Sequence, residues 1–581
     1  MNSPQESIPS GLPPNEAPHL SRLRIGEERL FLGIAILIGI LSGLAVVAFR
    51  TAIDRCHQLL LGSSPSGLRL LLAPTLTGLA IAVLVVRLFP RVRGSGVNQT
   101  KAALYVFNGY IPMRTAVGKF ITASLAIGSG QSLGPEDPSL QIGASLASAV
   151  GRRVRLSREN VRLLAPVGAA AGLAAAFNAP ISAVLFVIEE VIGRWSAGIL
   201  GSVVLSAISS VVVVRWVLGA QPIFRIPPLE VLRPQELLAY AVLGLIGGFA
   251  AVLFAHAIGW LRPRLKRLPR WTQYFQPAVA GLLIGVIAYF GAPQVMGAGY
   301  TYIEQAMHDQ FTWKMLAALA LLKIVATTFS FVSGTPGGMF APTLFVGAML
   351  GGAVGTLEHV LFPHLGGSVG TYCLVGMGVL FAGFLRAPMT SVFMVLEIGA
   401  DYSIILPVIV ANIIAYGISR MLQPTPVFDL LSRQDGLNLP SLEEQREERI
   451  LRVEDAMLPV PQLILDSGES ASQAVKRTNS AEADFFLIRL APSGWGRITQ
   501  KQLARFMSDG KQEITLGSIC GDQVPVLYPD VPLDMALRLV HRTELIPVIS
   551  RVDIHRLEGV ISRDAVLGKY EIIGTEEEPS A

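Results

Sequence analysis

The feature that most constrains this chain is a series of long apolar runs with few or no charges. Residues 30–49 are 20 consecutive residues without a charge, which is about the length of one helix across a bilayer. Apolar runs of similar length recur at residues 69–90, 198–218, 234–260, 275–292, 312–332, 368–385 and 402–420. So many candidate spans predict an integral, multi-pass membrane protein with the lipid bilayer as its surroundings.

Charged residues are unevenly distributed. They make up 15% of the 581 residues, but about 11% of residues 1–440 and about 28% of residues 441–581, where soluble domains have about 25%. Residues 1–28 are rich in Pro, Ser and Glu and lack the order of a signal peptide. We therefore predict four parts: a disordered tail over 1–28, a transmembrane domain over 29–422, a polar linker over 423–450 and a soluble domain over 451–575.

Shorter apolar pieces, interrupted by Gly and Pro, lie between the long runs. They fall near residues 115–130, 138–150, 163–176, 180–193 and 340–355, and we predict that they are too short to cross a membrane straight. A helix that ends inside a bilayer leaves backbone groups unpaired, which is tolerated only within protein or beside a water-filled cavity. This pattern favours a transporter or a channel over a receptor or an anchor.

An internal repeat relates two halves of the predicted membrane domain. Residues 168–189, which read GAAAGLAAAFNAPISAVLFVIE, align with residues 376–397, which read GMGVLFAGFLRAPMTSVFMVLE. Upstream, residues 134–151 align with residues 338–355. Interrupted segments at corresponding positions of two halves are typical of transporter sites, although the residues alone leave open whether the halves are parallel or inverted.

Three turns rich in Gly and Pro each precede a segment that can be helical. They are GSGVN at 94–98, GPEDP at 134–138 and GMFAP at 338–342. The first N–H groups of a helix have no internal partner, and with the helix dipole they can bind an anion without a cationic side chain. We predict that these helix starts together bind a small anion without direct contact from Lys or Arg. For any one turn alone, a simple helix start is the alternative.

These turns, the spacing from Lys119 to Glu136 and the stretch AAAFNAPISAVLFVIEE occur in an order that resembles the CLC family of chloride channels and proton-coupled chloride exchangers. The resemblance covers roughly residues 30–430. It implies an all-α, multi-span membrane domain of two inverted repeats with broken helices, packed as a homodimer with one anion pathway in each subunit. It also favours the plasma (inner) membrane, with the soluble domain in the cytoplasm, and the basic stretch 262–270 predicts the same side.

The resemblance implies the groups that bind the anion. Ser95 and the backbone amides of Met339 and Phe340 would coordinate the central anion. Phe428 stands where a central anion-binding Tyr is usual and has no hydroxyl to donate, so coupling is expected to be looser. Asn98 stands where Pro is common, which is a mild change in a loop.

The resemblance also implies roles for two glutamates. Glu136 would be the gating glutamate, whose carboxylate competes with the anion for the outer site, and Glu190 would be the inner proton-transfer glutamate. The alternatives are helix capping for Glu136 and an interfacial ion pair of Glu189 and Glu190 with Arg194. Asp137 replaces the usual Gly, which places another acid beside the anion path.

The soluble segment contains its own repeat. Residues 485–490 and 496–499 are similar to residues 545–550 and 559–562, and the pattern resembles a tandem pair of CBS motifs. Such pairs can bind adenine nucleotides between the two motifs, with Thr or Ser and a nearby Asp holding the ribose. Gln502 and Ala565 occupy the expected Asp positions, so a module that stabilises a dimer without nucleotide is the alternative.

Three functions are compatible with these features. A proton-coupled chloride exchanger is favoured by the two glutamates, and a passive voltage- or pH-gated chloride channel is the second hypothesis. A membrane enzyme or a metal-ion transporter is the third and least favoured, since the eight His and three Cys form no cluster. We therefore expect chloride and protons as substrates, no metal, no cofactor apart from a possible adenine nucleotide, no enzymatic activity, and no nucleic acid partner because basic residues are not interleaved with aromatics.

Overall fold

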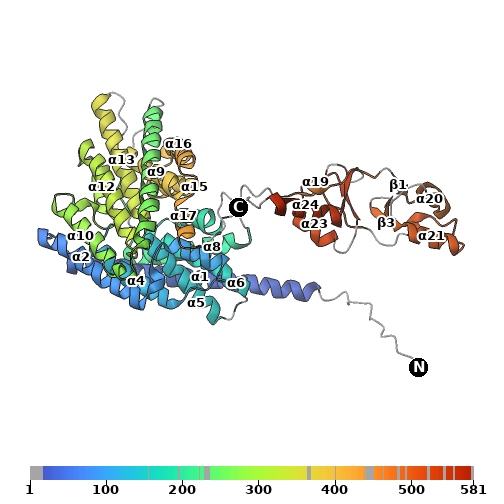
Figure 1. The fold of residues 1–581 in the computed structure, drawn as a ribbon, viewed down its shortest axis with the longest axis horizontal. Coiled ribbons are helices and arrows are strands. Elements are labelled where there is room, and N and C mark those ends of the chain that lie inside the picture. The colour runs from blue at the N-terminus through green and yellow to red at the C-terminus, as the bar shows by residue number, and fades with distance from the viewer. Residues whose placement is uncertain are drawn as a thin grey trace. The chain divides into compact units, whose positions relative to one another are not determined.

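The fold drawn in Figure 1 is that of a computed structural model. The chain divides into two compact units between residues 445 and 446, and each is described by itself. The structure describes residues 17–154, 156, 158–193, 197–220, 223–227, 236–362, 368–399, 401–437, 439, 451–461, 463–479, 485–490, 494–519, 524–540, 545–551, 553 and 556–576.

The first unit is built from helices and the turns between them, drawn from blue to light orange in Figure 1. Three of its short helical pieces, η1, η3 and η7, are π-helical. The helices are α1 (Ala17–Leu60), α2 (Gly67–Val83), η1 (Leu84–Leu88), α3 (Gly96–Tyr105), α4 (Met113–Gly128), α5 (Glu136–Arg153), α6 (Arg158–Phe177), α7 (Pro180–Phe186), η3 (Val187–Ile192), α8 (Ala197–Leu218), α9 (Leu237–Arg267), α10 (Gln276–Tyr289), α11 (Tyr300–Met307), α12 (Trp313–Val332), α13 (Phe340–Leu361), α14 (Val369–Leu380), η7 (Phe381–Leu385), α15 (Pro388–Gly399), α16 (Ile405–Leu422) and α17 (Val427–Gln434).

Eight helical stretches in the described part of the chain are long and apolar enough to cross a membrane. Two of them correct the prediction that 163–176 and 340–355 are too short, because α6 and α13 have 20 and 22 residues. Their glycines do not end the helices. Conversely, the long run at 275–292 forms only the 14-residue helix α10.

Two predicted boundaries also differ from the structure. Helix α1 begins at Ala17, so the second part of the predicted tail continues a membrane helix, while residues 1–16 lie outside the described residues. Helix α17 lies in the stretch predicted as a linker. The sequence of α17 is polar overall, but its apolar face packs on the other helices of the first unit. Val427 and Phe428 are therefore buried.

Glycines let the helices of each half cross closely. A Cβ at Gly143 of α5 would lie 2.1 Å from the carbonyl oxygen of Gly168 on α6. At the repeat-related crossing of α13 and α14, a Cβ at Gly347 would lie 2.2 Å from the carbonyl oxygen of Gly376. Small residues at such crossings allow membrane helices to pack backbone to backbone. The glycines that seemed to interrupt these segments therefore hold full-length helices together.

Two carboxylates join the halves through reciprocal helix caps. Glu189 accepts hydrogen bonds from the amides of Met389 (3.2 Å) and Thr390 (2.9 Å) at the start of α15. Glu397 accepts bonds from the amides of Ile181 (2.9 Å) and Ser182 (2.7 Å) at the start of α7. Each carboxylate satisfies N–H groups that have no partner inside their own helix. The aligned segments of the sequence thus meet each other in space.

The second unit is a small α/β structure, drawn in orange and red in Figure 1. One sheet has the order β1-β2-β3, with β1 parallel to β2 and β2 antiparallel to β3. The other pairs β4 and β5 antiparallel. The elements are α19 (Val453–Ala456), β1 (Ile464–Asp466), α20 (Ala471–Thr478), β2 (Phe485–Arg489), β3 (Trp495–Thr499), α21 (Gln500–Ser508), α22 (Leu516–Ile519), α23 (Leu533–Val540), β4 (Leu545–Ile549), β5 (Leu557–Ser562) and α24 (Arg563–Glu576).

Candidate functional site

Two of the three predicted turns meet directly. The amide of Gly134 donates to the carbonyl of Gly338 at 2.8 Å, and the amide of Gly338 donates to the carbonyl of Gly134 at 2.9 Å. Helices α5 and α13 begin within two residues of this bridge. The N–H groups at the starts of the two helices therefore converge on one buried region of the first unit.

Glu136 reaches from the start of α5 to the starts of two other helices. Its Oε2 accepts a long hydrogen bond of 3.4 Å from the amide of Ala341 on α13, and the hydroxyl of Tyr300 on α11 donates to its Oε1. The side chain is fully buried. Its carboxylate therefore reaches beyond its own helix to donors at the starts of α13 and α11, and the first N–H groups of a helix can bind an anion.

Ser95 is the N-cap of α3, but its hydroxyl is engaged by a neighbouring acid. It donates to Asp137 Oδ2 at 3.0 Å and accepts from the amide of Val97 at 3.1 Å. The Val97 amide also donates to Asp137 Oδ1 at 3.1 Å. Asp137 is fully buried. Its carboxylate therefore binds the donors at the start of α3 inside the first unit.

The aromatic candidates lie together. Phe340 and Phe428 are both buried, and their ring centroids are 6.3 Å apart. The ring of Phe186 packs edge-to-face on Phe340, with centroids 4.9 Å apart. The Nδ2 of Asn98 donates to the Phe428 carbonyl at 2.9 Å, which holds the backbone of Phe428 in place. Met339, also buried, immediately precedes α13.

Glu190 lies in a charged cluster that the sequence analysis missed. The ammonium of Lys101 on α3 is 3.4 Å from Glu190 Oε1 and 3.1 Å from Asp429 Oδ1 on α17. All three side chains are buried. Glu189 turns away to cap α15, and Arg194, the expected ion-pair partner, lies outside the described residues. A lone lysine six positions after Ser95 and an acid directly after Phe428 were the available signals.

Lys119 and Lys323 have matching structural roles. Lys119 Nζ donates to the carbonyls of Val92 (3.1 Å) and Gly94 (2.9 Å). Lys323 Nζ donates to the carbonyls of Val295 (2.9 Å) and Gly297 (2.7 Å). Each ammonium therefore holds the turn that leads into a helix start, α3 in the first half and α11 in the second.

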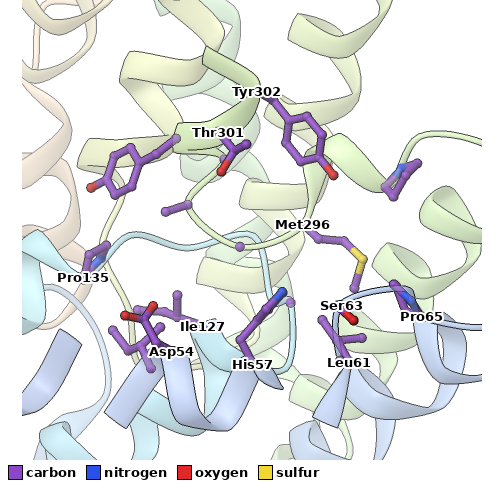
Figure 2. A pocket seen from close by; sticks show the side chains of 18 of the residues that line it. Asp54, His57, Leu61, Ser63, Pro65, Ile127, Pro135, Met296, Thr301 and Tyr302 are labelled. Atoms are coloured by element: carbon purple, nitrogen blue, oxygen red, sulfur yellow. The ribbon is translucent and has the colours of Figure 1, made fainter. Parts of the chain in front are cut away.

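Two cavities border this region. The first, of about 460 Å³, is lined by residues of α1, of the turn before the candidate span Gly67–Leu88 and of the segment 293–305, and it reaches Pro135 and Tyr300. Figure 2 shows Asp54 and His57 rising from α1 toward Thr301 and Tyr302 in this cavity. The second, of about 390 Å³, is lined by residues after the span and reaches Ser95. Glu136 accepts from Tyr300, which lines the first cavity, and Asp137 accepts from Ser95, which lines the second.

The part of the chain that the structure describes contains no group of three or more His, Cys, Asp or Glu side chains that could hold a metal ion. Cys373 is a buried free thiol and Cys56 is partly exposed, while Cys520 lies outside the described residues.

Known proteins are similar to this chain over most of its first unit. The model of the family described as voltage gated chloride channel matches residues 77–420. A ClcB-like protein of Ralstonia nicotianae, named as a candidate chloride channel, is 32% identical over 70% of this chain and 99% of its own length. The H(+)/Cl(−) exchange transporter ClcA of Salmonella arizonae is 32% identical over 73% of this chain and 96% of its own length.

A solved structure has the same fold. The crystal structure of a slow cyanobacterial Cl⁻/H⁺ antiporter superposes with a TM-score of 0.63 and 25% identity, and the match covers 72% of this chain and 98% of that one. A eukaryotic CLC transporter, at 19% identity, superposes over 92% of this chain with a TM-score of 0.61. The second match supports the fold alone.

Proposed function

The chain belongs to the voltage-gated chloride channel family, and we propose that it exchanges chloride for protons across a membrane. The observation that carries this proposal is the buried carboxylate of Glu136, bonded to the amide of Ala341 at the start of α13. The exchangers among its relatives support the same conclusion.

Glu136 acts as the gating glutamate in this proposal. When ionised, its carboxylate occupies the outer anion position, because the amide of Ala341 and the hydroxyl of Tyr300 donate to it as they would to chloride. When protonated, it loses the charge that these donors favour and leaves the position to the anion. Proton binding and chloride passage are thereby linked through one side chain.

Glu190 acts as the inner proton-transfer group. It is buried on the π-helical segment η3, and Lys101 lies between it and Asp429. A carboxylate at this depth requires a counter-charge or a proton, so Glu190 can alternate between pairing with Lys101 and carrying a proton. Transfer between Glu136 and Glu190 supplies the proton half of the exchange.

The central anion is assigned to Ser95 and the amides of Met339 and Phe340. These amides lie at the start of α13, where backbone N–H groups have no helical partner. Phe428 closes the inner side with a ring that packs on Phe340. Because this ring offers no hydroxyl, we expect the exchange to be partly uncoupled.

The two halves are proposed to be inverted repeats, and the protein a homodimer in the plasma (inner) membrane. The reciprocal bonds of Gly134 and Gly338, together with the reciprocal caps of Glu189 and Glu397, support a local two-fold relation between the halves. The basic residues at the end of α9 support a cytoplasmic position for that end, and with it for the second unit.

The second unit is proposed to be a tandem CBS pair that stabilises the dimer without an enzymatic role. Its two strand pairs, β2–β3 and β4–β5, are each followed by a helix. The Gln502 side chain accepts from the Thr499 amide at 2.9 Å, and the Thr499 hydroxyl accepts from the Gln502 amide at 3.1 Å. The Thr499 hydroxyl, which would hold a ribose in such a pair, is thus engaged in a helix cap. This favours the alternative without a nucleotide.

A passive chloride channel is the second candidate function. It is favoured by Phe428, which replaces the usual hydroxyl donor, and by the name of the Ralstonia relative. A channel would conduct chloride down its gradient without moving protons.

Reconstituted liposomes with opposed chloride and proton gradients distinguish the two functions. In the wild type, an outward chloride gradient should drive protons inward against a pH gradient, as measured with a pH electrode. Glu136→Gln should keep chloride flux and stop proton flux, because its amide cannot titrate. Glu190→Gln should also stop proton flux but keep competition between Glu136 and chloride. If chloride gradients move no protons in the wild type, the channel function replaces the exchanger.

A further inference from the structure

The first half carries two adjacent acids that bind different helix starts. Glu136 turns to Ala341 on α13 and to Tyr300 on α11. Asp137 turns to α3, where its two carboxylate oxygens accept from Ser95 and from Val97. Both acids are fully buried. Only the first has a role in the proposed exchange, so the second requires its own explanation.

Asp137 occupies donors that the proposed function assigns to chloride. The Ser95 hydroxyl cannot donate to an anion while it donates to Asp137 Oδ2. The space is also filled, because a Cβ at Gly96 would lie 2.6 Å from Asp137 Oδ1. An ionised carboxylate at this position repels a second anion in addition to blocking it. Chloride and Asp137 therefore exclude each other at the start of α3.

The hydrogen-bond donors that hold Asp137 could bind another anion in its place. Ser95 and Val97 are neutral donors at a helix start, where the same groups can bind either a carboxylate or a free anion. Lys119 interacts electrostatically with Asp137, but its ammonium donates to the carbonyls of Val92 and Gly94. The carboxylate is thus held at the site without a direct ion pair.

Asp137 is bonded to a residue that lines one of the two cavities. Ser95, which binds Asp137, lines the cavity of about 390 Å³, and Tyr300, which binds Glu136, lines the cavity of about 460 Å³. Each cavity is therefore lined by a residue that binds one of the two carboxylates.

We propose that Asp137 is a second tethered carboxylate, which fills the inner anion position at the start of α3 and has to withdraw before chloride binds there. This inference rests on the proposed function, because it assumes that chloride uses Ser95. It makes Asp137 a specificity- and rate-determining residue of the transport cycle. A fixed brace between α3 and α5 is the opposing interpretation, in which Asp137 never leaves its donors.

Chloride binding to the purified full-length protein separates the two interpretations. Isothermal titration with chloride should give a Kd for Asp137→Ala that is at least about tenfold lower than that of the wild type, a difference of about 1.4 kcal/mol. Asp137→Asn keeps the shape but removes the charge and one acceptor, so its Kd should fall between the two. Glu358→Gln, which neutralises a buried acid near the far end of α13, should bind as the wild type does.

A second measurement covers the case in which Asp137→Ala folds poorly. Crystals of Asp137→Asn soaked in bromide should give an anomalous peak beside the Ser95 hydroxyl that wild-type crystals lack under the same conditions. Wild-type affinity in both variants, with no bromide beside Ser95, would establish the brace and overturn the proposal.

Transport assays keep this test separate from that of the proposed function. If the wild type moves no protons but Asp137→Ala binds chloride more tightly, the exchanger fails and the second tethered carboxylate stands. If the wild type exchanges normally but neither Asp137 variant changes the Kd, only the inference about Asp137 fails.

Discussion

The turns that begin α5 and α13 are two copies of one sequence pattern with opposite chemistry. Both start with a glycine of the reciprocal Gly134–Gly338 bridge, and both lead into a long helix with a proline in its first turn. The first copy follows with Glu136 and Asp137, whereas the second follows with Met339 and Phe340. The first copy thus supplies carboxylates, and the second supplies backbone amides.

This difference separates the parts of the repeat that build the frame from those that carry the chemistry. The glycine crossings, the two buried lysines and the reciprocal glutamate caps occur in both halves in equivalent places. The acids occur in one half only. Matched substitutions at equivalent positions should therefore have similar effects on stability and different effects on transport.

The charged cluster around Lys101 should break this equivalence most strongly, because Lys101 is the sixth residue of α3, whereas the sixth residue of α11 is the uncharged Gln305. Lys101→Met leaves Glu190 and Asp429 buried without a counter-charge. Loss of one partner of a buried ion pair costs about 3–5 kcal/mol, so the unfolding midpoint in detergent should fall sharply.

Combining Lys101→Met with Asp429→Asn provides the control for that prediction. The double variant leaves only Glu190 to be neutralised, and a single buried carboxyl can take up a proton. The midpoint should therefore recover in part. A double variant no more stable than Lys101→Met alone would contradict the role assigned to Lys101.

The matched lysines should sharpen the comparison. Lys119→Met and Lys323→Met each remove two hydrogen bonds to buried carbonyls, which should cost about 1–3 kcal/mol in either half. Transport should differ. The Lys119 variant loosens the turn before Ser95 and should weaken chloride binding, whereas the Lys323 variant loosens the turn before Tyr300 and should lower the proton-to-chloride ratio. Calorimetry and liposome fluxes would measure these effects.

The reciprocal caps should behave alike. Glu189→Gln and Glu397→Gln each weaken a cap at the start of a short helix, at a cost of about 1 kcal/mol. The two unfolding midpoints should fall by similar amounts, while chloride affinity stays unchanged. A selective loss of proton flux in Glu189→Gln would mean that Glu189, and not only Glu190, carries protons.

An exposed ion pair in the second unit should give the smallest effect and sets the scale for the others. Arg551 donates to Asp530 at 2.7 Å, and this hydrogen bond holds the pKa of the Asp530 carboxyl below its usual range. Its stabilising contribution is therefore complete above the ordinary carboxyl pKa of about 4 and is lost as the pH falls through the lowered value. Asp530→Asn should change the unfolding midpoint of the second unit slightly at neutral pH and not at all in strong acid.

The helix starts could be predicted from sequence because they depend on local chemistry. The turns before α3, α5 and α13 contain the small residues and prolines that start a helix. The lengths of α6 and α13 were misjudged for a related reason: glycine was interpreted as an interruption, although in these helices it lies at a crossing with a neighbour.

Partners far apart in the chain were not predictable in the same way. Ser95 and Asp137 are 42 residues apart, and Lys101 and Asp429 are 328 residues apart. Their contacts depend on how α3 packs against α5 and α17, which no local pattern specifies. The family resemblance named the expected site residues, but it did not predict that Asp137 binds the hydroxyl of Ser95.

The two partners of each reciprocal cap are synthesised at different times. Ser182 receives its cap from a carboxylate 215 residues further along the chain. At the usual rate of about 5–20 residues per second, the ribosome needs roughly 10–40 s to deliver that residue. During this interval the amides at the start of α7 have no cap from Glu397, and Glu189 has no amides of α15 to bind. Until the second half emerges, these N–H groups have to be satisfied by another partner.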